Sequence, residues 1–314
     1  MARKGYQMKR IFFAVVIITS AICANAQSFI QLWPEGKKPN FNGKKITDSI
    51  YNERAWRVTQ PGMYSFLANK DENNGTAVLI CPGGGYERVS YVYNGFNLAK
   101  WYNNIGVNAF VLIYRLPHQQ DLQQRELAPL QDAQRAIKII RNNSTAWNLK
   151  PGKIGVMGIS AGGHLATMLG THLKDVSVIN DPLDTVSVRP DFMVLLSPVI
   201  TMGEYAHPGS KRNFLGANTT KAMIEEYSNE LQVSSFTPPT FIVHAFNDKT
   251  VNVKNSLLFY QALTDKNINA SIHVFPQGGH GIRMDNNPGS TDLWLELLGL
   301  WLKEMKFVEP LPFK

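Results

Sequence analysis

From residue 76 onward, short apolar runs alternate along the chain with segments whose apolar residues recur at helical spacing. The predicted strands are 76–81, 107–114, 153–158, 192–196, 240–245 and 270–275, and the predicted helices are 93–105, 129–142, 161–169, 256–264 and 293–305. Strands that are apolar throughout are typical of parallel sheets covered on both faces. Since crossovers between parallel strands are right-handed, the pattern predicts an α/β fold with a doubly wound, mostly parallel sheet and helices on both faces.

Residues 1–26 have the pattern of an export signal. A basic start is followed by an apolar run over 11–18 and by the small-x-small site Ala24-Asn25-Ala26. The run is too short to span a bilayer, so we expect cleavage before Gln27 and an exported protein, periplasmic or secreted, without stable membrane insertion. A retained N-terminal anchor is the alternative, and Met8 is an alternative start. Residues 27–314 then fit one catalytic domain, whose polar, turn-rich stretch 27–75 leads into the core.

Loss of the signal changes the charge and the cysteine content. It removes four basic residues and lowers the formal net charge from +8 to +4. The chain has no Lys/Arg run that would follow phosphates, so nucleic acid is not an expected partner. Cys23 leaves with the signal and Cys81 remains alone. It cannot form an internal disulfide, so we expect it to be buried.

Gly158-Ile159-Ser160-Ala161-Gly162 is a G-x-S-x-G motif between a predicted strand and a predicted helix. Its glycines permit a sharp turn that presents Ser160 at the sheet edge, and a side chain at 158 or 162 would clash with neighbouring backbone. The motif therefore predicts a nucleophilic serine. The alternative is a tight strand-to-helix turn with no catalytic role.

A nucleophilic serine needs a base, and the base needs an orienting acid; on sheets of this type the order is Ser, acid, His. His280 is the histidine in a turn after the last predicted strand, between glycines. Asp248 directly follows strand 240–245 and is the predicted acid, with Asp265 as the alternative. Asp132 is interpreted as a salt-bridging residue on a helix face.

Charge on the attacked carbonyl oxygen requires N–H donors. Ala161 supplies one from the start of its helix. The second should come from the loop 81–86, CPGGGY, whose glycines let backbone approach a ligand. A phosphate cradle is the alternative reading of this loop, but neither P-loop nor G-x-G-x-x-G spacing is present. The chain also lacks an H-E-x-x-H motif or a Cys/His cluster, so we expect neither metal nor cofactor.

The sequence resembles α/β-hydrolases of the exported bacterial acetylxylan-esterase-like group, also called xylanase-B-like or feruloyl-esterase-like. The segments that carry the resemblance are CPGGGY at 81–86, VLIYRLPH at 111–118, PLQDAQRAIKIIR at 129–141, IGVMGISAGGHLATML at 154–169, RPDFMVLLSPVI at 189–200, PPTFIVHAFNDKTVNVKNSLLFYQAL at 238–263 and HVFPQGGHG at 273–281. The resemblance implies the triad Ser160, Asp248 and His280. It also implies an oxyanion hole from the N–H groups of Gly84, Gly85 and Ala161. Lipase-type relatives carry His where Pro82 stands, which leaves Tyr86 as an alternative donor.

The resemblance further implies a secreted serine esterase that removes O-acetyl groups from xylan or xylo-oligosaccharides through an acyl-enzyme. Its partner is then an acetylated plant polysaccharide or oligosaccharide. Substrate contacts are predicted at Tyr86, His118 and His207, and the polar segment 201–237 suits a sugar-facing rim. The alternatives are a feruloyl or general carboxylesterase, a serine peptidase on the same fold, and a noncatalytic binding protein.

Overall fold

The computed structural model describes residues 27–309, so the predicted signal 1–26 and residues 310–314 lie outside the described residues. A mixed sheet of eight strands organises this part of the chain, in the order β1-β4-β6-β5-β7-β8-β9-β10. The strands are β1 (Ser28–Gln31), β4 (Gly62–Phe66), β5 (Ala77–Cys81), β6 (Asn108–Ile113), β7 (Ile154–Ile159), β8 (Met193–Leu196), β9 (Thr240–Ala245) and β10 (Ala270–Phe275). From β6 to β10 all neighbours are parallel, whereas β1 and β4 pair antiparallel.

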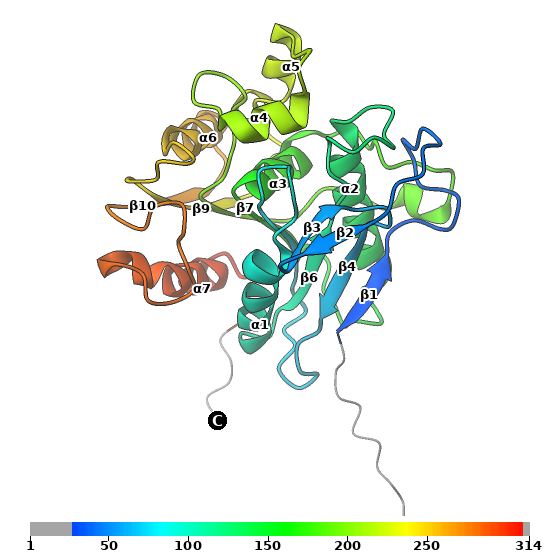
Figure 1. The fold of residues 1–314 in the computed structure, drawn as a ribbon. Coiled ribbons are helices and arrows are strands. Elements are labelled where there is room, and N and C mark those ends of the chain that lie inside the picture. Colours follow the sequence, from blue (N-terminus) through cyan, green and yellow to red (C-terminus); the bar gives the residue numbers. More distant parts are fainter. Residues whose placement is uncertain (1–26, 310–314) are drawn as a thin grey trace, which may run out of the picture.

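Helices cover both faces of the sheet (Figure 1). The helices are α1 (Asn97–Asn104), α2 (Leu127–Asn142), α3 (Ala161–Thr171), α4 (Pro208–Leu215), α5 (Lys221–Glu226), α6 (Lys254–Asp265) and α7 (Trp294–Glu304). One buried cluster joins α2, α3 and α6 to the sheet, and a second joins α1 and α7 to its opposite face. Strands β5, β6, β7 and β9 are buried at every residue because side chains on both faces meet helices. The predicted doubly wound, mostly parallel α/β fold is confirmed.

The stretch 27–75 does not only lead into the core but also forms strands. It supplies β1 and β4 of the main sheet and the separate hairpin of β2 (Ser49–Tyr51) and β3 (Arg54–Arg57). Ala55 of this hairpin exchanges two backbone hydrogen bonds with Val89, at 3.0 and 2.8 Å. The hairpin is thereby fastened beside the glycine-rich loop that follows β5.

The segment 201–237, predicted to form a sugar-facing rim, is folded around apolar anchors, and its contact with substrate stays a prediction. It contains α4, α5 and a 3₁₀ turn, Asn229–Gln232. Phe214 is fully buried and packs on Tyr86 and Tyr227, with ring centroids 4.8 and 5.1 Å apart. Buried apolar side chains thus fasten the segment to the rest of the protein, while α5 has no buried residue.

Asp132 forms the ion pair predicted for the face of its helix α2, and this ion pair is buried. Its Oδ1 accepts from Arg115 Nη2 at 2.8 Å and from Trp33 Nε1 at 2.8 Å, and both charged side chains are fully buried. Arg115 also donates to the carbonyl of Pro39 at 2.6 Å. The pair therefore ties α2 to the segment after β6 and to the N-terminal stretch.

The prediction that Cys81 is buried is confirmed, since it has no exposed surface at the end of β5. Over residues 27–309, none of the helices combines the length and apolar character needed to cross a membrane.

Candidate active site

Ser160 occupies a strained turn between β7 and α3. Its φ of 55° and ψ of −123° place a non-glycine residue in a region that side chains rarely adopt. The Ser160 N–H donates to Leu196 at 3.1 Å, and its carbonyl accepts from Val199 at 2.9 Å. These bonds hold the turn between neighbouring strand ends and present the Ser160 hydroxyl at the carboxyl edge of the sheet.

The two motif glycines are required by close backbone approach, as the sequence predicted. A Cβ on Gly162 would collide with the carbonyl oxygens of Cys81 and Pro82, and one on Gly158 would collide with the carbonyl of Gly162. Strand β7 and helix α3 therefore meet at a distance that only glycine permits.

His280 and Asp248 meet Ser160 in a hydrogen-bonded chain. The Ser160 hydroxyl lies 2.9 Å from His280 Nε2, and His280 Nδ1 lies 2.7 Å from Asp248 Oδ2. A carboxylate accepts only, so Nδ1 carries the proton and Nε2 is free to accept from the serine. The structure thus brings together the nucleophile, base and acid predicted from sequence.

The loops that carry His280 and Asp248 are fastened to each other. The Gly279 N–H donates to Asn247 Oδ1 at 2.8 Å. Asp248 Oδ1 accepts the N–H groups of Thr250 and Val251 at 2.8 and 2.9 Å. These bonds orient the carboxylate and leave Oδ2 for His280.

A second histidine, for which the sequence predicted no role, also contacts Asp248. His244 Nε2 lies 3.2 Å from Asp248 Oδ2 and 3.0 Å from the carbonyl of Val251. Its Nδ1 lies 2.7 Å from the hydroxyl of Ser256. Because the Val251 carbonyl only accepts, Nε2 carries the proton, and the Ser256 hydroxyl donates to Nδ1. In the sequence, the spacing His244-x-x-x-Asp248 at the end of a predicted strand could have indicated this contact.

Asp248 is held ionised by these partners. Burial opposes its ionisation, but hydrogen bonds from His244, His280 and the Val251 N–H outweigh burial and hold the pKa of Asp248 well below its usual range. A permanent carboxylate beside His280 favours the imidazolium form that a proton acceptor must reach.

The glycine-rich loop lies against the nucleophile. A Cβ on Gly83 would stand 3.1 Å from Ser160 Cβ and 2.9 Å from the Ile159 carbonyl. The carbonyls of Gly83, Gly84 and Gly85, which share peptide planes with the N–H groups of Gly84, Gly85 and Tyr86, accept hydrogen bonds from Ser90 N–H at 2.9 Å, Arg88 N–H at 3.2 Å and Asn213 Nδ2 at 2.9 Å. The peptide planes of the predicted donors are therefore fixed before substrate arrives.

The backbone N–H groups predicted for the oxyanion hole have no hydrogen-bond acceptor within the described residues. Within residues 27–309, the N–H groups of Gly84, Gly85, Tyr86 and Ala161 donate no hydrogen bond to backbone or side chain. Ala161 opens α3, where the helix leaves its first N–H groups without partners. The loop and the helix start together offer unpaired donors beside Ser160, and the choice among Gly84, Gly85 and Tyr86 stays open.

The predicted substrate contact through the Tyr86 side chain is wrong. Tyr86 has a φ of 56°, is fully buried and donates its hydroxyl to His164 Nδ1 at 2.9 Å. His164 Nε2 in turn donates to the Tyr227 carbonyl at 2.8 Å, and burial lowers the pKa of His164 to about 3. Tyr86 thus anchors the glycine-rich loop to α3 through a permanently neutral histidine.

His118 and His207 remain near the surface. His118 Nδ1 contacts the Tyr86 carbonyl at 3.1 Å and is exposed. His207 starts α4 and accepts the Ser210 N–H at 3.1 Å; burial lowers its pKa, and the nearby His280 lowers it further. Their substrate contacts stay predictions. The alternative acid Asp265 lies at the end of α6, hydrogen-bonded to Gln261, and has no contact with His280.

Among residues 27–309, no group of three or more His, Cys, Asp or Glu side chains is arranged to hold a metal ion.

The family model BD-FAE matches residues 65–263. The chain is 36% identical over 249 residues to endo-1,4-beta-xylanase B of Butyrivibrio fibrisolvens, covering 78% of this chain and 39% of that protein. It is 34% identical over 237 residues to an acetylxylan esterase of Xylanibacter ruminicola, covering 74% and 46%. The chain thus spans less than half the length of these two relatives.

Solved structures show the same fold. An acetyl ester-xyloside bifunctional hydrolase from Caldicellulosiruptor lactoaceticus superposes with a TM-score of 0.78 at 35% identity, covering 90% of this chain and 97% of that one. An esterase from Thermogutta terrifontis gives a TM-score of 0.66 at 22% identity, covering 88% and 98%. The second likeness concerns the fold alone.

Proposed function

Since the chain belongs to the BD-FAE family of α/β-hydrolases, we propose that it is a serine esterase that hydrolyses carboxylic esters through an acyl-enzyme. The family match over residues 65–263, together with the two curated relatives, confirms the resemblance stated from the sequence. The observation that carries the proposal is the chain Ser160–His280–Asp248, with contacts of 2.9 and 2.7 Å on a strand-to-helix turn.

In the first half-reaction, Ser160 Oγ attacks the ester carbonyl carbon while His280 Nε2 takes the hydroxyl proton. Asp248 stabilises the imidazolium. The former carbonyl oxygen, now negatively charged, accepts hydrogen bonds from the N–H groups of Ala161 and the glycine-rich loop. Collapse of this intermediate breaks the bond to the alcohol oxygen. The alcohol leaves with the proton from His280.

In the second half-reaction, water takes the place of the alcohol. His280 removes a proton from the water as its oxygen attacks the acyl carbon. The bond to Ser160 Oγ then breaks, the serine regains its proton from His280, and the carboxylic acid is released. Each group ends in its starting state.

For substrate, we propose O-acetyl groups on xylan or xylo-oligosaccharides. Support comes from the names of the similar proteins, an acetylxylan esterase, a xylanase and an acetyl ester-xyloside hydrolase. In a small acyl site, a longer acyl chain adds no binding free energy. In an apolar tunnel, each buried CH₂ of the acyl chain would add up to about 0.8 kcal/mol.

Replacement of the nucleophile tests the mechanism. Ser160→Ala should lower kcat on 4-nitrophenyl acetate at least about 10⁴-fold while the melting temperature stays near that of wild type. The exposed Ser235 provides the matched control, Ser235→Ala, with unchanged turnover. Retained turnover in purified Ser160→Ala would exclude Ser160 as the nucleophile.

An ester panel tests the substrate. Specificity constants should fall from acetyl through butyryl to octanoyl esters, and acetate should be released from acetylated xylan. A rise with acyl length and no acetate from xylan would indicate a general carboxylesterase. Release of ferulate exceeding that of acetate would indicate a feruloyl esterase.

We also propose that residues 1–26 direct export and are then removed. Mass spectrometry of the protein from its native host should give an N-terminus at Gln27. An intact N-terminus on membrane-associated protein would instead support a retained anchor.

A further inference from the structure

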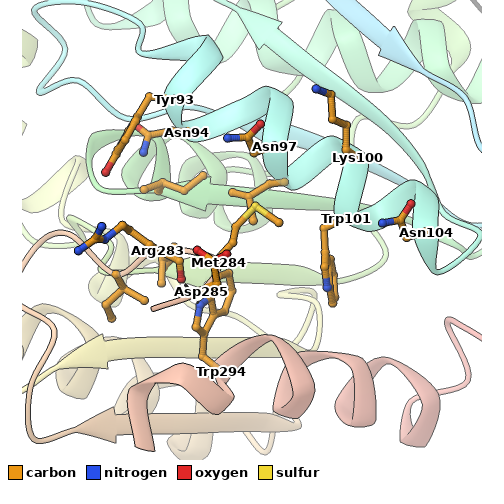
Figure 2. A pocket seen from close by; sticks show the side chains of 14 residues that line it. Tyr93, Asn94, Asn97, Lys100, Trp101, Asn104, Arg283, Met284, Asp285 and Trp294 are labelled. Carbon is orange, nitrogen blue, oxygen red and sulfur yellow. Dashed lines mark hydrogen bonds between the residues drawn. The ribbon is translucent and has the colours of Figure 1, made fainter. Parts of the chain in front are cut away.

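An open groove of about 430 Å³ lies between α1 and the segment that follows His280 (Figure 2). Its floor is apolar and is formed by Leu98, Ile159 and Leu196. The wall on the α1 side is polar and aromatic, with Asn94, Asn97, Trp101 and Asn104. The opposite wall mixes charged and apolar side chains, among them Arg283 and Met284. The volume lies within the usual range for small-molecule sites.

One end of the groove reaches the catalytic residues. Ile159 immediately precedes Ser160, and Arg283 lies three residues after His280. A Cβ placed on Gly83 would stand 3.1 Å from Ser160 Cβ and 3.6 Å from Asn94 Oδ1, so Asn94 is a near neighbour of the nucleophile. Figure 2 shows Tyr93, Asn94 and Arg283 gathered at one end and Asn104 at the other.

The α1 wall presents neutral hydrogen-bonding groups in a row. Asn94, Asn97, Trp101 and Asn104 follow at intervals of three, four and three, which places them along one side of the helical segment. The row extends for about 15 Å at the rise of a helix. Within residues 27–309, the side-chain amides of these three asparagines form no hydrogen bond with the protein. Asparagine is a poor helix former, so helix propensity does not account for them.

The opposite wall is held in place. Trp294 is buried, and its Nε1 donates to the Arg283 carbonyl at 2.6 Å. This bond fixes the segment after His280 against α7. The groove is therefore a formed feature, with a rigid wall facing the row of asparagines.

We propose that this groove binds the neutral sugar chain that carries the scissile ester, an inference that rests on the proposed esterase function. Amide side chains both donate and accept hydrogen bonds, as sugar hydroxyls require. The half-buried Trp101 offers an apolar ring for the C–H face of a pyranose. An alkyl chain would fit less well, because it would leave the row of amides on the α1 wall without partners and would stay in contact with water in an open groove.

The groove variants are Asn97→Ala, Asn104→Ala and Trp101→Ala. Asn97 and Asn104 are exposed and without hydrogen bonds in the described protein, so their variants should fold normally. Each variant should lower kcat/KM for acetylated xylo-oligosaccharides about two- to tenfold, mainly through KM, since each loses one or two contacts. Turnover of 4-nitrophenyl acetate, which has no sugar chain, should not change.

A matched control is Asn142→Ala, an exposed asparagine at the end of α2 that lies outside the groove, on the other face of the sheet from α1. It should match wild type on both substrates. In the Ser160→Ala background, titration with acetylated xylo-oligosaccharide should show weaker binding when Asn97→Ala is added. This readout does not depend on turnover.

Wild-type rates on acetylated oligosaccharide in all groove variants would overturn the inference, and so would equal losses on both substrates. Losses confined to ethyl ferulate relative to ethyl acetate would also overturn it and assign the groove to an aromatic acyl group. A wild-type enzyme that cleaves 4-nitrophenyl acetate but releases no acetate from any oligosaccharide would instead refute the proposed substrate. The two failures are therefore distinguishable.

Discussion

The buried imidazole of His244 lies 3.2 Å from Oδ2 of Asp248, the same oxygen that contacts His280 at 2.7 Å. Ser256 completes the line behind it, at 2.7 Å from His244 Nδ1. The catalytic carboxylate thus has a donor on each of two histidines. His244 is a positioning residue, since it acts through Asp248 and not on substrate.

Replacement of His244 should therefore impair catalysis without affecting substrate affinity. His244→Asn should lower kcat about tenfold or more with little change in KM, because a hydrogen bond to a charged group is lost. His273→Asn is the matched control on the adjacent strand β10, where the side chain is partly exposed and contacts Ser271. Equal effects of both variants, or a change in KM alone, would contradict the role of His244. Steady-state kinetics on 4-nitrophenyl acetate distinguishes these results.

Asp248→Asn should keep the shape of the site but favour the wrong tautomer of His280. By analogy with serine proteases, we expect kcat to fall roughly 10⁴-fold. Asp265→Asn, at the exposed end of α6, should leave kcat unchanged. The acid assignment would be wrong if Asp265→Asn proved the more damaging change in the same assay.

The neutral His164 should make stability depend on pH. Its pKa is about 3 in the folded protein, against about 6.5 in an unfolded chain. Between these values the unfolded chain binds more protons, so stability rises with pH and is lost as pH falls below about 6.5. For wild type, the urea midpoint of unfolding should decrease from pH 7.5 to pH 6 and again to pH 5. The midpoint of His164→Asn should depend less steeply on pH.

The comparison for His164 is again His273→Asn, which should retain most of the wild-type pH dependence because His273 is less buried than His164. A His164→Asn profile parallel to that of wild type would show that His164 is not the group responsible.

Removal of one partner from the buried pair of Asp132 and Arg115 should strongly destabilise the protein. Asp132→Ala leaves the Arg115 guanidinium and the Trp33 N–H without their acceptor, and we expect a loss of about 3–5 kcal/mol in the free energy of unfolding. The exposed Asp265→Ala should change it by less than about 0.5 kcal/mol. Denaturant unfolding measures both, and a loss near that of Asp265→Ala would contradict the argument.

The central strands could be predicted from sequence because a strand covered on both faces is apolar throughout. Strands β1 and β4 were missed for the opposite reason. They are short and antiparallel, and β1 is largely exposed, so neither shows a long apolar run. The hairpin of β2 and β3 depends on pairing with Val89, a contact that no local pattern encodes.

At the site, the order of Ser160, Asp248 and His280 was readable because each residue follows a predicted strand. The direction in which a side chain points could not be predicted from the sequence. Tyr86 follows three glycines, which suggests an exposed loop, but its positive φ turns the ring inward onto Phe214. His244 was missed because a histidine within a strand usually packs, and its contact with Asp248 depends on the turn after β9.

The buried thiol of Cys81 offers an internal reporter of opening. Burial raises the pKa of Cys81, so in the closed protein the thiol is both inaccessible and unreactive. It is the single cysteine among residues 27–309 and belongs to β5, between β6 and β7 at the centre of the sheet. A thiol reagent can therefore label the folded domain only when these strands separate, and its labelling rate measures how often the central sheet opens.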